Sequence, residues 1–153
     1  DVLVGNAAEL GPLSPLGHVG PQAFERVMTV NATANYRLIR SLDPLLRAAE
    51  AGRAVFVTCA QARAAKPFWG AYAASKAALE ALVLAYAAET RRTTVRVNLI
   101  DPGPLATRLR AQAYPGEDPH KLPEPATVAQ AFVALAEPGC TQHGALIGAA
   151  GGA

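Results

Sequence analysis

The sequence predicts an α/β fold with a layered parallel sheet, and two observations support this prediction. Four short apolar runs rich in β-branched residues occur at residues 2–4, 54–58, 95–100 and 145–147. Runs of this kind are typical of strands that are buried on both faces. Stretches with helical periodicity separate the runs. Strands that alternate with helices imply right-handed parallel crossovers, so we expect these strands to be neighbours in chain order.

The first helical stretch follows the first apolar run and spans residues 22–50. Its apolar side chains recur with a period close to 3.6 residues, as on the buried face of an amphipathic helix. Asn31 lies on this apolar stripe, three residues after Met28. A buried amide without hydrogen-bond partners costs about 1–3 kcal/mol. The position therefore favours a bound water, a break in the helix, or an amide satisfied by neighbouring backbone.

A second helix is predicted for residues 71–90, after the second apolar run. This stretch is rich in alanine and apolar on most of its faces, which suggests burial against more than one surface. We expect this helix and the helix from Gln22 to cover the same face of the sheet.

The last helical stretch, residues 127–136, is shorter, and Thr127 is a candidate N-cap after Pro125. The Pro-rich, polar stretch 108–125 that precedes it is too long for an ordinary connector. Long loops in compact domains are usually functional lids or mobile segments. We therefore expect such a loop here.

Composition restricts the class of protein. The chain has 153 residues, of which 51% are hydrophobic and 17% charged, as expected for one globular unit. Lys and Arg number 14 against 12 Asp and Glu, and they are scattered except for the pair Arg91 and Arg92. Nucleic acid is therefore not an expected partner.

Cys59 and Cys140 are the only cysteines, and they lack the spacing of a disulfide framework or a metal site. No apolar run approaches the roughly 20 residues of a membrane-spanning helix. We therefore expect no metal and no membrane partner, and a soluble protein in the reducing cytoplasm. The chain begins at Asp1, without Met and inside an apolar run. We expect it to lack the beginning of its domain.

The strongest motif is Tyr72 followed by Lys76, a spacing that places both side chains on one face of a helix. The surrounding residues 69–78, Trp-Gly-Ala-Tyr-Ala-Ala-Ser-Lys-Ala-Ala, closely resemble the active-site helix of the short-chain dehydrogenase/reductase family. Residues 5–8, Gly-Asn-Ala-Ala, stand where that family has Asn-Asn-Ala-Gly, and Asn31 stands at its catalytic Asn. Residues 101–107 match its Pro-Gly-x-x-x-Thr turn.

The resemblance covers essentially all 153 residues. It implies that residues 1–153 form the C-terminal half of a Rossmann-like three-layer domain, with about four of its parallel strands. The family's first half, a βαβ unit with a Gly-rich turn for the dinucleotide phosphates, has no counterpart in the sequence. Residues 113–122 resemble a bacterial subgroup of the family whose substrate is poorly defined.

The resemblance also implies roles for four catalytic candidates. Tyr72 would be the acid/base. Because tyrosine ionises near pH 10 in water, it needs stabilisation of its phenolate, and Lys76 would supply the charge. Asn31 would hold a water that passes protons through the lysine. Cys59, thirteen residues before Tyr72, stands at the family's catalytic Ser.

A thiol at the position of the catalytic Ser donates a weaker hydrogen bond to a substrate carbonyl, which implies reduced or redirected catalysis. Thr58 is not expected to replace it, because adjacent strand residues point to opposite faces. The histidines, His18, His120 and His143, match no catalytic constellation. We expect them in loops or at the surface.

The cofactor implied by the resemblance is NAD or NADP. Asn6 and Ala7 would line its nicotinamide-ribose side, and Tyr72 and Lys76 would also contact it. Pro102 and Gly103 would shape the turn beside the nicotinamide. The backbone and hydroxyl of Thr107 would contact the carboxamide.

Two functions follow as hypotheses. The first is an NAD(P)-dependent oxidoreductase that acts on a small-molecule carbonyl compound or secondary alcohol. The second is a non-catalytic remnant that serves as a binding or oligomerisation module, favoured by the missing half and by Cys59. In either case we expect a homo-oligomer, a dimer or tetramer packed through the helices from Gln22 and Ala71, because the second helix is apolar on many faces.

Overall fold

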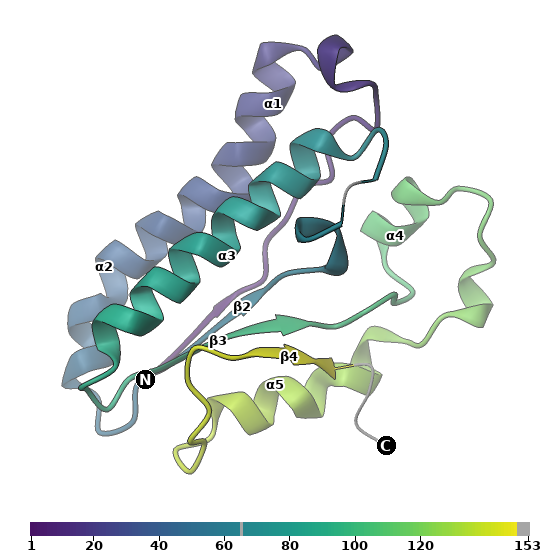
Figure 1. Cartoon of the computed structure of the whole chain (residues 1–153). Coiled ribbons are helices and arrows are strands. Elements are labelled where there is room, and N and C mark those ends of the chain that lie inside the picture. The colour runs from purple at the N-terminus through teal and green to yellow at the C-terminus, as the bar shows by residue number, and fades with distance from the viewer. Residues whose placement is uncertain (65, 150–153) are drawn as a thin grey trace.

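A parallel sheet forms the centre of the computed structural model, which describes residues 1–64 and 66–149 (Figure 1). Its strands are β1 (Val2–Gly5), β2 (Arg53–Val57), β3 (Arg96–Asp101) and β4 (Leu146–Gly148). They lie in the order β1-β2-β3-β4, and every neighbouring pair is parallel. The predicted strand order and direction are confirmed, and each predicted boundary lies within one residue of the observed one.

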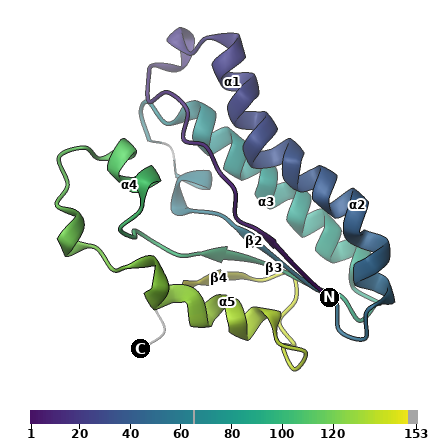
Figure 2. The same cartoon turned by 180° about the vertical axis from the view of Figure 1, so that it is seen from behind.

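Helices cover both faces of this sheet and complete the three layers (Figures 1 and 2). One face carries α1 (Pro21–Met28), α2 (Ala34–Ala48) and α3 (Gly70–Thr90), and the other carries α5 (Ala129–Ala136). The predicted α/β class and the shared face of the first two helical stretches are confirmed. Every helix in the described part of the chain is too short or too polar to cross a membrane.

Alternation along the strands divides the core into two clusters. Leu3, Phe56 and Leu99 point to the face covered by α2 and α3 and pack in the larger cluster. Val57 and Ile100, each adjacent to one of these residues, point to the other face and pack with Leu135 of α5. Because successive strand side chains point to opposite faces, strands covered on both sides must be apolar throughout. This requirement explains the continuous apolar runs.

The predicted helix over residues 22–50 is irregular at Asn31. A π-helical turn, Thr29–Thr33, separates α1 from α2 and contains this residue. The Asn35 side chain donates a hydrogen bond to the Asn31 main-chain carbonyl at 2.8 Å. The helix therefore changes to a π-helical hydrogen-bonding pattern at Asn31 without ending there, and turns of this type are frequent at functional sites.

Gly5 occupies the first position of the Gly-Asn-Ala-Ala motif because two side chains fill the adjacent space. A Cβ atom at this position would lie 2.4 Å from the Phe56 ring and 2.4 Å from Asn35 Oδ1. Glycine replaces the family's Asn at this position, and the space that an Asn side chain would need is filled by Phe56 and Asn35.

Two predictions near the C-terminal part of the chain are wrong. Thr127 is not the N-cap of α5, because the 3-10 helix Pro125–Val128 precedes that helix and directs the Thr127 hydroxyl to the Glu124 carbonyl at 2.7 Å. Residues 108–125 do not form a continuous loop. They contain α4 (Arg108–Ala113) and the 3-10 helix Pro119–Lys121, because Thr107 and Asp118 cap these elements.

His143 lies in the loop before β4, as predicted, but it is half-buried and links two elements of the core. Its Nδ1 accepts a hydrogen bond from the Val97 N–H at 3.2 Å, and its Nε2 lies 2.8 Å from the Ala87 carbonyl. The ring therefore joins α3 to β3. His18 and His120 are exposed, as predicted.

Arg53 is a buried cation at the start of β2, with 4% of its surface exposed. Its guanidinium donates to the carbonyls of Gly52, Thr94 and Glu137 at 2.9, 3.2 and 3.0 Å, and also to that of Pro138. Glu137 and Pro138 follow α5 directly. The planar guanidinium therefore fastens the end of α5 to the sheet.

Replacing Arg53 by Lys is expected to lower the free energy of unfolding by about 2 kcal/mol, because a single ammonium cannot satisfy carbonyls in several directions. The matched control is Arg47→Lys, which alters an ion pair with Asp43 at the surface. This control should change the free energy by less than about 0.5 kcal/mol. Urea denaturation followed by circular dichroism measures both, and equal values for the two variants would contradict the role of Arg53.

Candidate active site

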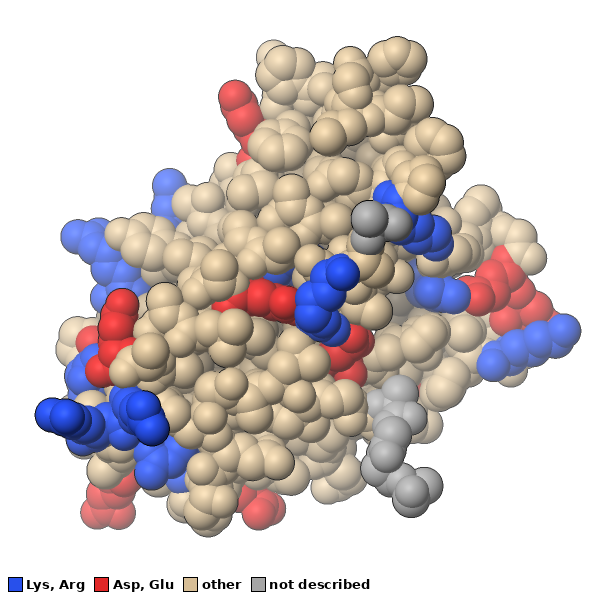
Figure 3. Space-filling model, viewed as in Figure 1, with Lys and Arg blue, Asp and Glu red and all other residues tan. Residues whose placement is uncertain are grey.

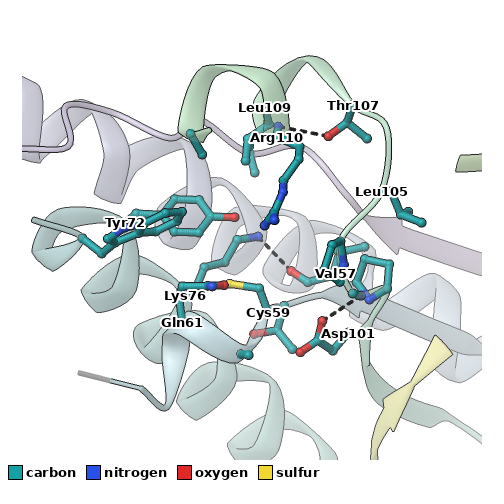
Figure 4. Close-up of a pocket in the computed structure, with 18 of the residues that line it drawn as sticks. Val57, Cys59, Gln61, Tyr72, Lys76, Asp101, Leu105, Thr107, Leu109 and Arg110 are labelled. Atoms are coloured by element: carbon teal, nitrogen blue, oxygen red, sulfur yellow. Dashed lines mark hydrogen bonds between the residues drawn. The ribbon is translucent and has the colours of Figure 1, made fainter. Parts of the chain in front are cut away.

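A cavity of about 390 Å³ opens at the carboxyl ends of the strands (Figure 4). The loops after β1, β2 and β3 line it together with α3 and α4. Most of the residues that the sequence predicts for the site line this cavity: Asn6, Cys59, Tyr72, Lys76, Pro102, Gly103 and Thr107. The carboxyl edge of an open parallel sheet is where α/β proteins bind their ligands.

Tyr72 and Lys76 project into the cavity from the first turns of α3. Both residues are buried, with 6% and 2% of their surface exposed. The Lys76 ammonium donates a hydrogen bond to the Val57 carbonyl at 2.8 Å and lies 6.0 Å from the centre of the Tyr72 ring. In Figure 4 the ends of the two side chains point toward the same space, beside Cys59.

Burial dominates the titration of both groups. It raises the pKa of Tyr72 far above the ordinary value for tyrosine, and the neighbouring Cys59 thiol and Asp101 carboxylate raise it further. Burial also lowers the pKa of Lys76, although Cys59 opposes this shift. The Tyr72 hydroxyl is therefore a proton donor at neutral pH. To serve as a base, it requires additional positive charge in the cavity.

Cys59 is half-buried, just beyond β2. Burial raises the pKa of its thiol, while Lys76 and nearby backbone N–H groups lower it to a smaller extent. The thiol is thus protonated near neutral pH. Thr58 does not replace it, because its hydroxyl donates to the Glu80 carboxylate at 2.6 Å.

Asn31 lies behind the cavity and is not one of its lining residues. It is completely buried, and its Oδ1 accepts from the Glu9 N–H at 2.8 Å. Its Nδ2 donates to the Glu9 carbonyl and to the Ser75 hydroxyl, both at 2.9 Å. Ser75 in turn donates to the Tyr72 carbonyl at 2.7 Å. Neighbouring groups therefore satisfy all the hydrogen-bonding capacity that the side-chain amide uses, which was one of the alternatives considered from the sequence. Through these bonds the amide joins the segment after β1 to α3.

The segment after β1 differs from the prediction in one position. Asn6 lines the cavity, as expected. Ala8 lines it as well, whereas Ala7 is exposed and is not among the lining residues.

The turn after β3 has the form that the Pro-Gly motif predicts. Gly103 has a φ of +70°, which other residues rarely adopt, and its N–H donates to the Asp101 carboxylate at 3.0 Å. The Thr107 hydroxyl accepts from the Arg110 N–H at 3.1 Å and so caps α4. Its own O–H remains able to donate toward the cavity.

An ion-pair network that includes the cavity residue Asp101 was not predicted from the sequence. The Arg63 guanidinium pairs with Asp101, at 3.3 Å, and with Glu80. These residues come from the loop after β2, the end of β3 and the middle of α3. Asp101 is adjacent to the recognised Pro-Gly turn, but nothing in the local sequence indicates its partner. In Figure 3, acidic and basic side chains lie interspersed on this face of the molecule.

The sequence also did not predict the aromatic wall of the cavity, which consists of Trp69, Tyr72 and Tyr114. Trp69 packs on Tyr72 with ring centres 5.9 Å apart and on Tyr114 with ring centres 5.7 Å apart. Leu109 and Ala113 of α4 pack against the same cluster. The stretch expected to be a lid or mobile loop therefore forms part of the cavity wall. The position of Trp69 in residues 69–78 was the one feature of the sequence that could have indicated an aromatic side chain beside the site.

The polar side chains in the cavity suit an organic ligand. Lys76 offers an ammonium, Asn6 an amide, and Tyr72 and Thr107 hydroxyls. Among residues 1–64 and 66–149, no group of three or more His, Cys, Asp or Glu side chains is arranged to hold a metal ion.

Comparison with known proteins identifies relatives. Residues 1–118 match the family model described as short chain dehydrogenase. The chain is 40% identical over 135 residues to the uncharacterized oxidoreductase YciK of Escherichia coli K12. The matched region covers 88% of this chain and 53% of YciK. It is 34% identical over 109 residues to the NADPH-dependent aldehyde reductase-like protein of Arabidopsis thaliana chloroplasts, covering 71% of this chain and 40% of the relative. The chain thus spans about half the length of these relatives.

Solved structures agree with the observed fold. A protein from Escherichia coli CFT073, described as a short chain dehydrogenase complexed with NADPH, superposes with a TM-score of 0.92 at 37% identity. The superposition covers 97% of this chain and 62% of that one. The predicted Rossmann-like architecture is confirmed by this likeness.

Alkylation of Cys59 tests the electrostatics of the cavity. In a Cys140→Ala background, the rate of reaction with iodoacetamide should rise only at a pH above the ordinary thiol range, because burial raises the pKa of Cys59. Lys76→Met should slow the reaction further at any pH below the midpoint, since the Lys76 charge favours the thiolate. Lys121→Met, at an exposed position, is the control and should have no effect. A faster reaction in Lys76→Met would disprove the assignment.

Proposed function

The chain belongs to the short-chain dehydrogenase/reductase family, and on this premise we propose that the protein is an NAD(P)-dependent oxidoreductase acting on a carbonyl compound or secondary alcohol. The observation that carries the proposal is the cavity at the carboxyl ends of the strands, where Tyr72, Lys76 and Cys59 meet. The proposal extends to a whole protein in which residues 1–153 supply the second half of the domain and a preceding βαβ unit supplies the phosphate site.

The residues in the cavity fit the nicotinamide end of such a cofactor. The Lys76 ammonium has three donors, of which Val57 receives one, and the others suit ribose hydroxyls. Asn6 and the Pro102–Gly103 turn provide an uncharged wall, and the Thr107 hydroxyl is able to donate to a carboxamide. We extend the cofactor role to Ala7 through its backbone. When bound, the cofactor supplies or accepts the hydride, and its oxidised ring adds positive charge.

Tyr72 is the proposed acid/base of the reaction. In carbonyl reduction its neutral hydroxyl donates a proton to the substrate oxygen, and the phenolate that remains must be stabilised because burial raises the pKa of Tyr72. In alcohol oxidation Tyr72 must act as a phenolate, which accepts the proton of the alcohol. Before this transfer, positive charge from Lys76 and from the oxidised cofactor would stabilise the phenolate.

Cys59 is the proposed donor to the substrate carbonyl. Its protonated thiol lies beside Tyr72, and a thiol donates a weaker hydrogen bond than the hydroxyl that the family places here. We therefore propose catalysis that is weak toward simple ketones. Asn31 is proposed to hold a water on the proton path through Lys76 by its main-chain carbonyl, because its side-chain amide is engaged by Glu9 and Ser75.

The second candidate function is a non-catalytic binding or assembly module, favoured by the thiol at the serine position. Both functions are compatible with a homo-oligomer, which we propose to form through α2 and α3. Leu38 and Leu45 on α2 and Leu84 on α3 expose 40%, 63% and 46% of their surface. We also propose a cytoplasmic location, which the free thiols of Cys59 and Cys140 support.

Reduction of a panel of simple ketones by the full-length protein tests the proposed chemistry. Tyr72→Phe should abolish turnover because the proton donor is lost. Cys59→Ser should raise kcat, since one oxyanion donor contributes about 10²–10³ in well-studied hydrolases. Cys140→Ser is the control, and Cys140 is not a residue that lines the cavity. Abolished turnover in Cys59→Ser would instead indicate a thiol that forms an adduct with the substrate, and unchanged turnover would place Cys59 outside the active site.

Sedimentation velocity tests the proposed assembly. The protein should sediment as a dimer or tetramer, and the double variant Leu45→Glu/Leu84→Glu should sediment as a monomer, because charges would replace apolar contacts. Val133→Glu, on the opposite face of the sheet and 48% exposed, should leave the assembly unchanged. A monodisperse wild-type monomer would count against the proposal.

A further inference from the structure

Aromatic and aliphatic side chains form one side of the cavity. Trp69, Tyr72 and Tyr114 line it together with Leu109 and Ala113. Trp69 is only 6% exposed and contacts both tyrosines, edge-on with Tyr72 at an interplanar angle of 71° and tilted by 40° with Tyr114. Aromatic rings prefer such tilted and edge-on contacts, and a further flat ring entering the cavity would meet partners of the same kind.

Two cations hold Tyr114 in this wall. The Lys66 ammonium donates to the Tyr114 hydroxyl at 2.6 Å and lies 4.6 Å from the centre of its ring. The same ammonium lies 4.8 Å from the centre of the Trp69 ring. The Arg110 guanidinium carbon lies 3.8 Å from the centre of the Tyr114 ring. Both the hydroxyl and the ring of Tyr114 are therefore engaged, so its position is defined by the protein.

Arg110 and Asp101, which line the cavity near this wall, are already in ion pairs. Arg110 forms two hydrogen bonds with Glu117, at 2.5 and 2.7 Å, and this pairing raises the pKa of the guanidinium. Asp101 is paired with Arg63 and raises the pKa of Tyr72, which means that it disfavours a second negative charge there. A substrate carboxylate would have to displace Glu117 to reach Arg110, or the Tyr114 hydroxyl to reach Lys66, which does not line the cavity. The wall therefore suits an uncharged molecule.

The cavity is also small. Its volume of about 390 Å³ is near the lower end of the roughly 300–1,000 Å³ that ligand sites occupy. If the proposed function holds, the nicotinamide ring shares this space. The remaining room corresponds to a molecule of about one ring.

We propose that the substrate is a small, uncharged aryl ketone, aryl aldehyde or aryl alcohol whose ring packs against Trp69, and that Tyr114 sets the size limit. This inference rests on the proposed function for the reacting group, since the carbonyl or hydroxyl of such a molecule would face Tyr72 and Cys59. In Figure 4 the Tyr72 hydroxyl points into the space below Leu109, where such a group would lie.

The chain provides its own probe for this proposal. Trp69 is its single tryptophan, so intrinsic fluorescence, excited at the red edge of the tryptophan absorption, reports directly on the cavity wall. The matched ligands are 1-phenylethanol and mandelate, which differ by a methyl group in place of a carboxylate. Titration of each into the 153-residue chain requires neither cofactor nor turnover.

We expect a saturable change in Trp69 emission with 1-phenylethanol. In a Lys76→Met variant, which lacks the ammonium that within the described residues donates only to Val57, we expect a Kd at least about tenfold weaker for mandelate, because its carboxylate would be desolvated without a free cation. Tyr114→Ala should weaken 1-phenylethanol binding about tenfold and should admit the bulkier 1-(4-tert-butylphenyl)ethanol, which the parent chain excludes. Tyr114→Phe keeps the ring and should bind 1-phenylethanol within about twofold of the parent. Tyr36→Ala, at an exposed position on α2, is the control and should change nothing.

Mandelate binding as tightly as 1-phenylethanol in Lys76→Met, no saturable change with either ligand, or unchanged affinities in Tyr114→Ala would each overturn the proposal. Far-UV circular dichroism separates loss of binding from loss of folding, and a misfolded Tyr114→Ala is replaced by Tyr114→Leu. Turnover distinguishes this inference from the proposed function. Binding as expected without cofactor-dependent turnover by the full-length protein would defeat the proposed function alone, and Tyr72-dependent turnover of other ketones without aryl alcohol binding would defeat this inference alone.

Discussion

The hydrogen bond from the buried Lys76 ammonium to the Val57 carbonyl is the interaction on which the geometry of the site depends. A buried charge is costly unless it finds a hydrogen-bond partner, so α3 must lie where this ammonium reaches the end of β2. Tyr72 lies one helical turn before Lys76, and Cys59 lies two residues beyond Val57. One contact between a helix and a strand end therefore brings all three side chains to the same cavity.

Asn31 fixes the position of the segment after β1 relative to α3, as Lys76 does for the end of β2. The π-helical turn between α1 and α2 turns its amide toward Glu9 and Ser75. Because all three of these residues belong to different segments, the amide connects the loop beside the cavity to the helix that carries Tyr72. A buried polar network in which every member is satisfied makes the arrangement specific rather than merely compact.

Burial and ion pairing set the protonation states of the titratable side chains in and around the cavity. Burial raises the pKa of both the Tyr72 hydroxyl and the Cys59 thiol, and Cys59 and Asp101 raise that of Tyr72 further, so both groups stay protonated and able to donate hydrogen bonds. In the proposed alcohol oxidation, Tyr72 needs a positive charge beside it, and the lowered pKa of Lys76 makes this charge harder to supply from the protein alone. The carboxylates of Glu80, Asp101 and Glu117 are paired with Arg63 or Arg110.

The sequence by itself determined the strands, their order and the pairing of Tyr72 with Lys76, because apolar periodicity and helical spacing are local properties of the chain. It also indicated an irregular helix at Asn31, since a polar residue on an apolar stripe conflicts with a regular buried helix. Only the tertiary structure decided the contacts of Arg63 with Asp101 and of Tyr114 with Trp69, which join residues 38 and 45 positions apart. Such contacts depend on how whole elements pack against one another. Local patterns do not encode that packing, and so the aromatic wall of the cavity emerged only with the fold.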